Sequence, residues 1–189
     1  APPPGPPPGP PPSAGHKPPP QNFDQTPQPQ ESTPPGPGPD QLPPAWEDRL
    51  ANIPAGAKIL FTYFELGQDM GGAPDSLRRE LLTTIIHLMR WPKGVLGFWP
   101  HTEYSGQDIL PRNDLFWRGV SRLGVKRVAV FGERSLAELL PEADPKRLIH
   151  KHGAVHLLRL PSTEELKQST FEQIMHAIDP LRSFLHGLD

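Results

Sequence analysis

Residues 59–72 read ILFTYFELGQDMGG, an apolar and aromatic run that ends at a polar turn flanked by glycines. The run, which we place at residues 58–66, does not alternate between apolar and polar positions. A strand of this kind is covered on both faces, as in a parallel sheet. The turn at residues 67–72 is therefore either a loop of an active site or the plain connection from a strand into a helix.

Beyond this turn, helical and strand patterns alternate along the chain. Apolar residues recur at helical spacing from residue 75 or 76 to residue 90, where the Trp91-Pro92 step ends the helix. Regular alternation predicts an α/β domain, a three-layer sandwich with a four-stranded parallel sheet. The other predicted elements are helices at 46–53, 113–123, 133–140 and from Ser162, strands at 94–100, 126–132 and 154–160, and loops at 101–112 and 141–153.

The N-terminal segment has a different composition from the rest of the chain. Residues 1–44 hold 20 of the 29 prolines, and Phe23 and Leu42 are their only large apolar side chains. Such a segment cannot bury enough apolar surface to offset its ordering entropy, so we expect a disordered tail with polyproline II character. The tail is expected to act as a linker or to bind a protein partner, and residues 45–189 to form a single folded domain.

Charge and composition restrict the function of that domain. Residues 45–189 carry 18 basic and 18 acidic side chains, and a neutral domain has no global attraction for nucleic acid. The chain has no cysteine, which excludes disulfides and Cys-ligated metals. No apolar stretch is long enough to span a bilayer. We expect a soluble cytoplasmic protein that does not bind membranes and needs no cofactor.

Three segments should meet at the carboxyl ends of the strands, where ligands bind in such folds: residues 67–72, 98–104 and 159–162. The first contains Gln68 and Asp69, and a carboxylate in this position can activate a water molecule. No phosphate-binding glycine motif is present. The alternative is structural, because Asp69 or Asp75 can also stabilise the N-terminus of the following helix.

The second segment, at residues 98–104, combines aromatic and titratable side chains. Phe98 and Trp99 could stack on a nucleobase, and His101, which stands near Glu103 in the sequence, could act as an acid or base but has no evident partner. Neighbouring residues of a strand point to opposite faces, so core packing is the alternative for either ring.

The connection at residues 141–153 is basic and rich in histidine. Its histidines, with one on the next strand, have the spacing i, i+2, i+6, which does not place three ligands on one helical face, so no metal site is predicted. Its cations are the expected contacts to DNA phosphates. They are Lys146, Arg147 and Lys151.

Together these motifs resemble the uracil-DNA glycosylase superfamily. Its first motif often begins with the sequence found here at Gly67-Gln68-Asp69, and KRVAVFGERSLAELLP at residues 126–141 is similar to its third strand and following helix. Its last motif, commonly His-Pro-Ser, corresponds to residues 160–162. The resemblance implies a four-stranded parallel sheet with flanking helices, a water-positioning role for Asp69, and a place beside the base for Pro161 and Ser162.

The chain departs from this family at the residues that carry its chemistry. Leu160 replaces the histidine that stabilises the departing base, and Leu can neither donate a hydrogen bond nor carry charge. The family's uracil-reading Asn has no counterpart around Phe98, and its Pro-Tyr is replaced by Met70-Gly71. Losing one transition-state donor typically costs on the order of a hundredfold in rate.

The sequence thus favours a degenerate glycosylase-like module, non-catalytic or catalytically altered, that works in DNA repair or replication through protein contacts or weak DNA contacts. The enzymatic alternative is a divergent base-excising glycosylase or a nucleotide-processing enzyme that uses Asp69 together with His101 or Glu103. A third alternative is a purely structural interaction domain whose proline-rich tail binds an aromatic groove elsewhere.

Overall fold

The computed structural model describes residue 5 and residues 41–186. Apart from Gly5 and residues 41–44, the predictions for the proline-rich tail lie outside this range. Leu42, which the sequence placed in the tail, is buried beside Trp46, and helix α1 (Pro44–Ala51) begins two residues after it. The folded domain therefore begins before residue 45, because Leu42 adds apolar area to its core.

The central sheet has five strands in the order β2-β1-β5-β7-β6. The first four are parallel to one another, and β6 is antiparallel to β7. The α/β class is confirmed with a mostly parallel sheet, but the prediction of four parallel strands missed the antiparallel β6. The bounds are β1 (Ile59–Tyr63), β2 (Leu96–Phe98), β5 (Arg127–Phe131), β6 (Ile149–His152) and β7 (Val155–Leu160).

The strand β6 lies in the segment predicted as a basic loop. A two-residue turn joins it to β7, and Gly153 in this turn has φ of +57°, which glycine adopts without strain. The strand itself, IHKH, has no apolar alternation, so its pattern gave no strand signal. The turn at Gly153 was the one local indication of a hairpin.

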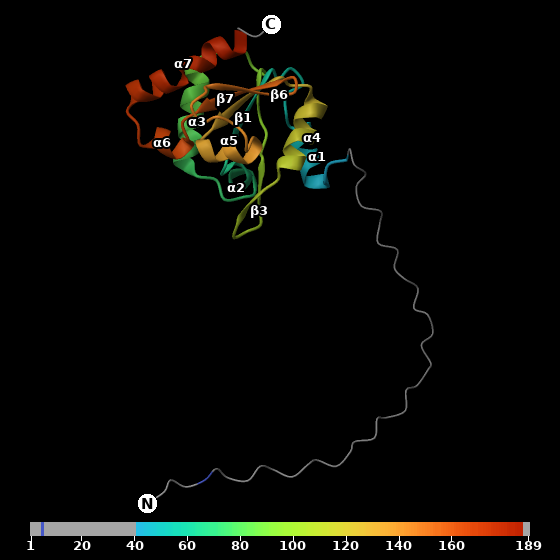
Figure 1. The fold of residues 1–189 in the computed structure, drawn as a ribbon. Helices are drawn as coiled ribbons and strands as arrows, with labels where there is room; N and C mark the ends of the chain where they lie inside the picture. The colour runs from blue at the N-terminus through green and yellow to red at the C-terminus, as the bar shows by residue number, and fades with distance from the viewer. Residues whose placement is uncertain (1–4, 6–40, 187–189) are drawn as a thin grey trace, which may run out of the picture. The chain divides into compact units, whose positions relative to one another are not determined.

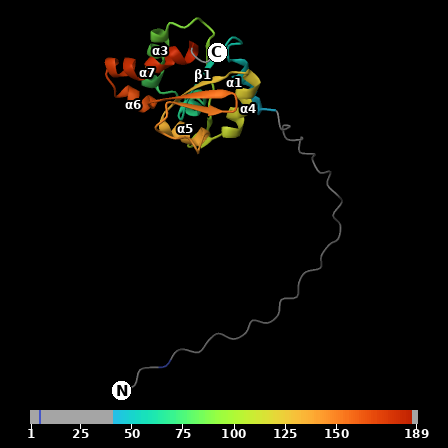
Figure 2. The ribbon, with the colours of Figure 1, turned by 45° about the horizontal axis from the view of Figure 1, so that its top comes forward.

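Helices cover both faces of the sheet (Figures 1 and 2). In β1, Ile59, Phe61 and Tyr63 pack into the core on one face, and Leu60 packs into the core on the other. This alternation makes β1 the centre of both cores. The first core holds α3 (Ser76–Met89), α6 (Thr163–Lys167) and α7 (Phe171–His186), and the second holds α1, α4 (Asn113–Leu123) and α5 (Glu133–Leu139).

Two further segments differ from the prediction. The expected loop at 101–112 contains a small hairpin of β3 (Thr102–Tyr104) and β4 (Ile109–Pro111), which extends below the sheet in Figure 1. The expected last helix is divided into α6 and α7, and Ser162 caps α6 in the predicted capping box with Glu165. The two strands of the hairpin have three residues each, too few for a periodic signal.

Candidate functional site

The turn of residues 67–72 forms a short helix, α2 (Leu66–Met70), after β1. It packs against β3, and a Cβ on Gly67 would lie 2.4 Å from the carbonyl oxygen of Thr102. The backbone N–H of Gly67 also donates to Thr102 Oγ1 over 3.2 Å. Gly67 is therefore required by packing between two parts of the protein, which explains the glycine without a ligand.

Both carboxylate oxygens of Asp69 accept hydrogen bonds from the protein. Oδ2 accepts from the hydroxyl of Tyr63 over 2.8 Å. Oδ1 accepts from the backbone N–H of Asp75 over 3.1 Å and from Nη1 of Arg78 over 2.7 Å. The side chains of Asp69 and Arg78 are only 13% and 6% exposed. Asp69 is thus the buried anion of an ion pair that joins α2 to the start of α3.

This ion pair belongs to a wider charge network. Nη2 of Arg78 lies 3.0 Å from Glu164, and Nζ of Lys167 lies 2.8 Å from Glu164 and 3.0 Å from Asp75. The Asp75 carboxylate also accepts from the backbone N–H of Arg78 and caps α3. The network ties α2, α3 and α6 together, and the contacts of Asp69 and Asp75 at the start of α3 match the structural alternative, in which one of the two stabilises the N-terminus of this helix.

The network shifts the pKa values of its members. Burial and the hydrogen bond to Asp69 raise the pKa of Tyr63 far above its usual range. The backbone hydrogen bond from Arg78, and then Lys167, lower the pKa of Asp75, while Lys167 is the main cause of the lowered pKa of Glu164. Tyr63 therefore stays protonated and donates, and the two carboxylates stay ionised well into acid.

His101 lies on the opposite face of the sheet from Asp69. Its Nδ1 shares a hydrogen bond of 2.8 Å with Oγ1 of Thr62, the neighbour of Tyr63 in β1, so the two side chains point to opposite faces. His101 is fully buried, and its ring meets Phe116 edge-on in the second core. Asp69 and His101 are therefore not brought together.

The other ring nitrogen of His101 faces a carboxylate. Nε2 lies 3.4 Å from Oε2 of Glu138, and neither atom has a hydrogen-bond partner. Burial alone would raise the pKa of Glu138, but attraction to His101 and Arg134 outweighs burial and lowers it. The group of Thr62, His101 and Glu138 has the donors and acceptors of a proton relay, yet Thr62 and His101 are both inaccessible to solvent.

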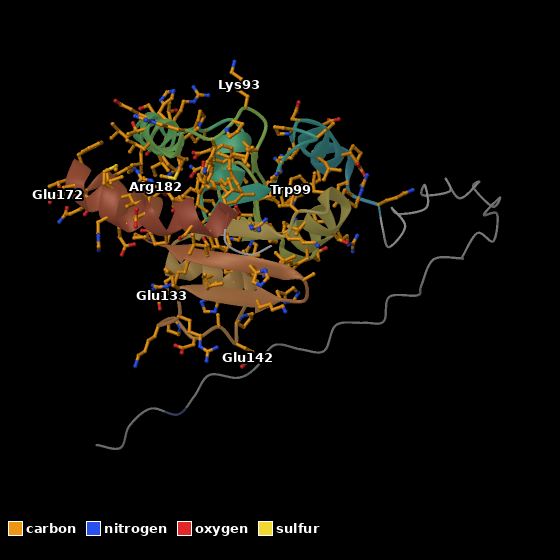
Figure 3. All side chains as sticks on the ribbon, turned by 90° about the horizontal axis from the view of Figure 1, so that it is seen from above. Lys93, Trp99, Glu133, Glu142, Glu172 and Arg182 are labelled. Carbon is orange, nitrogen blue, oxygen red and sulfur yellow. The ribbon has the colours of Figure 1, made fainter. Side chains whose placement is uncertain are left out.

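The two predicted stacking rings have different surroundings. Trp99 is fully buried and donates from Nε1 to the carbonyl of Phe116 over 3.0 Å, and Figure 3 shows it among the side chains between the sheet and helices α1 and α4. Phe98 is half-buried and lines a hollow of about 250 Å³ together with Asp69. Core packing therefore explains Trp99, and Phe98 is the predicted ring that reaches a cavity.

The last motif has a structural role at the start of α6. The Ser162 hydroxyl accepts from the backbone N–H of Glu165, and the Glu165 carboxylate accepts from the Ser162 backbone N–H over 2.7 Å. Pro161 is exposed, and Leu160 is 2% exposed in the first core. Gln68, the remaining predicted base contact, is half-buried in α2, where its backbone carbonyl accepts from Gly71.

The basic residues form a separate surface at the other edge of the sheet. Lys146, Arg147 and Lys151 are all exposed, and the last two line a hollow of about 750 Å³ beside β6. Glu142 and Asp144 line the same hollow and reduce its positive charge. Within residues 41–186 no group of three potential metal ligands comes together.

Sequence analysis missed the role of Arg78. The residue lies on the helical face that carries Leu81 and Leu82, and it is buried like them. A cation on the apolar face of a helix requires a buried anion nearby. This position was the signal that could have identified Arg78 as the partner of Asp69.

Comparison with known proteins adds no assignment, because neither a protein-family model nor a curated protein matches the chain. In the described part of the chain, no helix has the length and apolarity needed to cross a membrane.

Replacing Arg78 with Met should strongly destabilise the fold, because the carboxylate of Asp69 then loses its buried ion-pair partner. Breaking such a pair costs about 3 kcal/mol or more in the free energy of unfolding. The adjacent Arg79 is exposed, so Arg79→Met should change it by less than about 0.5 kcal/mol. Urea denaturation of both variants measures the difference, and equal stabilities would refute the structural role of Arg78.

Acid should destabilise the fold through Asp75 and Glu164. Their folded pKa values lie below the ordinary 3.8 and 4.5, so in acid the unfolded chain binds more protons and stability falls as pH falls. Lys167→Met removes a cation from both carboxylates and should flatten the decline between about pH 5.5 and pH 3. Free energies of unfolding measured across this range test the prediction. Lys93→Met is the control, because the side chain of Lys93 projects outward in Figure 3. An unchanged slope in Lys167→Met would contradict the assignment.

Proposed function

We propose that this domain is a degenerate, non-catalytic module of the uracil-DNA glycosylase type that works in DNA repair or replication through protein contacts and weak DNA contacts. One observation carries the proposal: the carboxylate at the water-activating position, Asp69, accepts three hydrogen bonds from the protein itself. The assignment to DNA metabolism rests on the resemblance of the motifs at residues 67–69, 126–141 and 160–162.

A carboxylate that activates water needs an oxygen directed at the reacting water molecule. Both oxygens of Asp69 are engaged, and releasing Oδ1 would leave Arg78 without its closest anion. Breaking a buried ion pair costs about 3–5 kcal/mol, which would be added to the barrier of each turnover. Leu160 in the position of the family's histidine supports the same conclusion, since its side chain is apolar and buried.

The enzymatic alternative requires Asp69 to share a pocket with His101 or Glu103. Asp69 contacts Tyr63 on one face of β1, and His101 contacts Thr62 on the other. Glu103 pairs with Arg112 across the β3–β4 hairpin over 2.7 Å. Catalysis by either combination would need side chains to exchange partners that they already have, so the geometry favours the non-catalytic proposal.

Weak DNA contact is supported by the exposed cations Lys146, Arg147 and Lys151. Each phosphate contact contributes a salt-dependent increment of affinity, and few such contacts give weak binding. Glu142 and Asp144 on the same surface repel phosphates. This surface therefore supports occasional contact with a nucleic acid that a partner protein holds nearby, and it favours protein contacts as the main interaction.

The full chain should release no base from duplex or single-stranded DNA that contains uracil or hypoxanthine, and should not cleave abasic DNA. A uracil-DNA glycosylase run in parallel serves as positive control, and circular dichroism confirms that the chain is folded. Robust release that Asp69→Asn abolishes would overturn the proposal. Release that survives this substitution would also overturn it and would direct attention to other residues.

A further inference from the structure

The strand β2 is an edge of the sheet with backbone groups directed outward. Val95 accepts from Lys58 over 2.7 Å and Trp99 donates to Phe61 over 3.1 Å, so residues 95, 97 and 99 face β1. In such a ladder, the backbone N–H and C=O groups of Leu96 and Phe98 point away from β1, toward the outside of the sheet. Along the strand order of the described sheet, no strand lies beyond β2 to pair with them.

This edge carries little of the protection that sheet edges usually have. Natural edges are blunted by charged side chains, prolines or bulges. The three residues of β2 are Leu, Gly and Phe, none of which is charged. Met70 on α2, beside this edge, is 39% exposed. The shortness of β2 is the main limit on pairing with another chain within the strand itself.

A hollow lies on each side of this edge. The first, of about 250 Å³, has apolar walls that include Leu82 and Ile86 of α3. The second, of about 390 Å³, is lined by Arg49 and Ile53 from the α1 side of the sheet. Met70 and Phe98 line both hollows, so the two meet at β2. Alternate side chains of an added strand would point to opposite faces and would enter one hollow or the other.

Charge indicates the kind of chain that fits. Nη1 of Arg49 is buried without a hydrogen-bond acceptor, and the guanidinium lies over the ring of Trp46, 5.3 Å from its centroid. Arg79 at the first hollow has no ion pair with any residue of the described domain. The acidic residues of the first hollow, Asp69 and Asp75, are already paired with Arg78 and Lys167. The edge therefore offers two guanidinium groups that no carboxylate of the described domain neutralises, and a carboxylate of a partner would pair with one of them.

We propose that the β2 edge binds an extended segment of a partner protein as a sixth strand. Its apolar side chains enter the hollow beside α3, and the alternate residues include an acidic one that pairs with Arg49. The inference rests on the part of the proposed function that assigns the domain to protein contacts, and it holds whether or not the domain excises bases.

The test begins with a displayed library of random eight-residue peptides, selected on the full chain and then synthesised for fluorescence polarisation. Selected peptides should alternate apolar residues with at least one Asp or Glu. N-methylation along the peptide should abolish binding at every second residue, because only those N–H groups bond to Leu96 and Phe98. This scan uses the unaltered protein, so it does not depend on the folding of a variant.

Charge exchange tests the predicted pairing. Arg49→Glu should weaken binding by about tenfold or more, and replacing the acidic peptide residue with Lys should restore it. Arg182→Glu changes an exposed cation on α7, which packs against β5 and β7, and should leave the affinity unchanged. The thermal midpoint of each variant shows whether it is folded.

Several results would overturn the inference. They are a library without selected peptides, N-methyl effects without a period of two, and weakening by Arg182→Glu but not by Arg49→Glu. A concentration-dependent dimer that Arg49→Glu dissociates would instead assign the edge to a second copy and reject a peptide partner. Base release by the chain would refute the proposed function alone, and loss of edge binding would refute this inference alone.

Discussion

The ion pair between Asp69 and Arg78 is the constraint on which this end of the domain depends. Two charges with so little exposure are stable only when they are paired and hydrogen-bonded. The hydrogen bonds that Asp69 and Arg78 make fix the hydroxyl of Tyr63, the backbone at Asp75 and the carboxylate of Glu164. The first strand and three helices are thereby held in one arrangement, and the carboxylate that could have served catalysis becomes part of the framework.

With Asp69 held in this ion pair, the surfaces that remain accessible indicate what the domain can bind. The carboxyl ends of the strands carry capped helices, a packed glycine and a buried leucine. The accessible features lie at the two edges of the sheet: an apolar edge at β2, whose arginines have no carboxylate partner in the described domain, and a mixed-charge hollow at β6. A domain whose sheet edges are more accessible than the carboxyl ends of its strands is suited to binding other chains, which agrees with the proposed role in protein contacts.

The fold was largely predictable from the sequence because its main elements are long and apolar. Five buried residues in succession in β1, and the helical spacing of Leu81, Leu82 and Ile85, arise from the two-sided core that they build. The strand β6 and the β3–β4 hairpin were not predictable in this way. Their residues are polar and few, and tertiary pairing with β7 or across a turn stabilises them.

The candidate site was less predictable, because a motif gives the identity of a residue without its partners. Asp69 suits water activation or an ion pair equally well until Arg78 is placed beside it. His101 and Asp69 follow neighbouring parallel strands, which suggested a common cleft. The segment after β2 instead turns to the face of Thr62, where the ring of His101 completes the second core.

A double-mutant cycle between Asp69 and Arg78 tests the central claim most directly. The free energies of unfolding of the parent, Asp69→Asn, Arg78→Met and the double variant give the coupling between the two side chains. The account predicts a coupling of about 2–3 kcal/mol, the upper range for residues in direct contact. If the effects of the two single substitutions add to within about 0.5 kcal/mol, the claim is contradicted, because Asp69 would then not be held by Arg78 and would be available for chemistry.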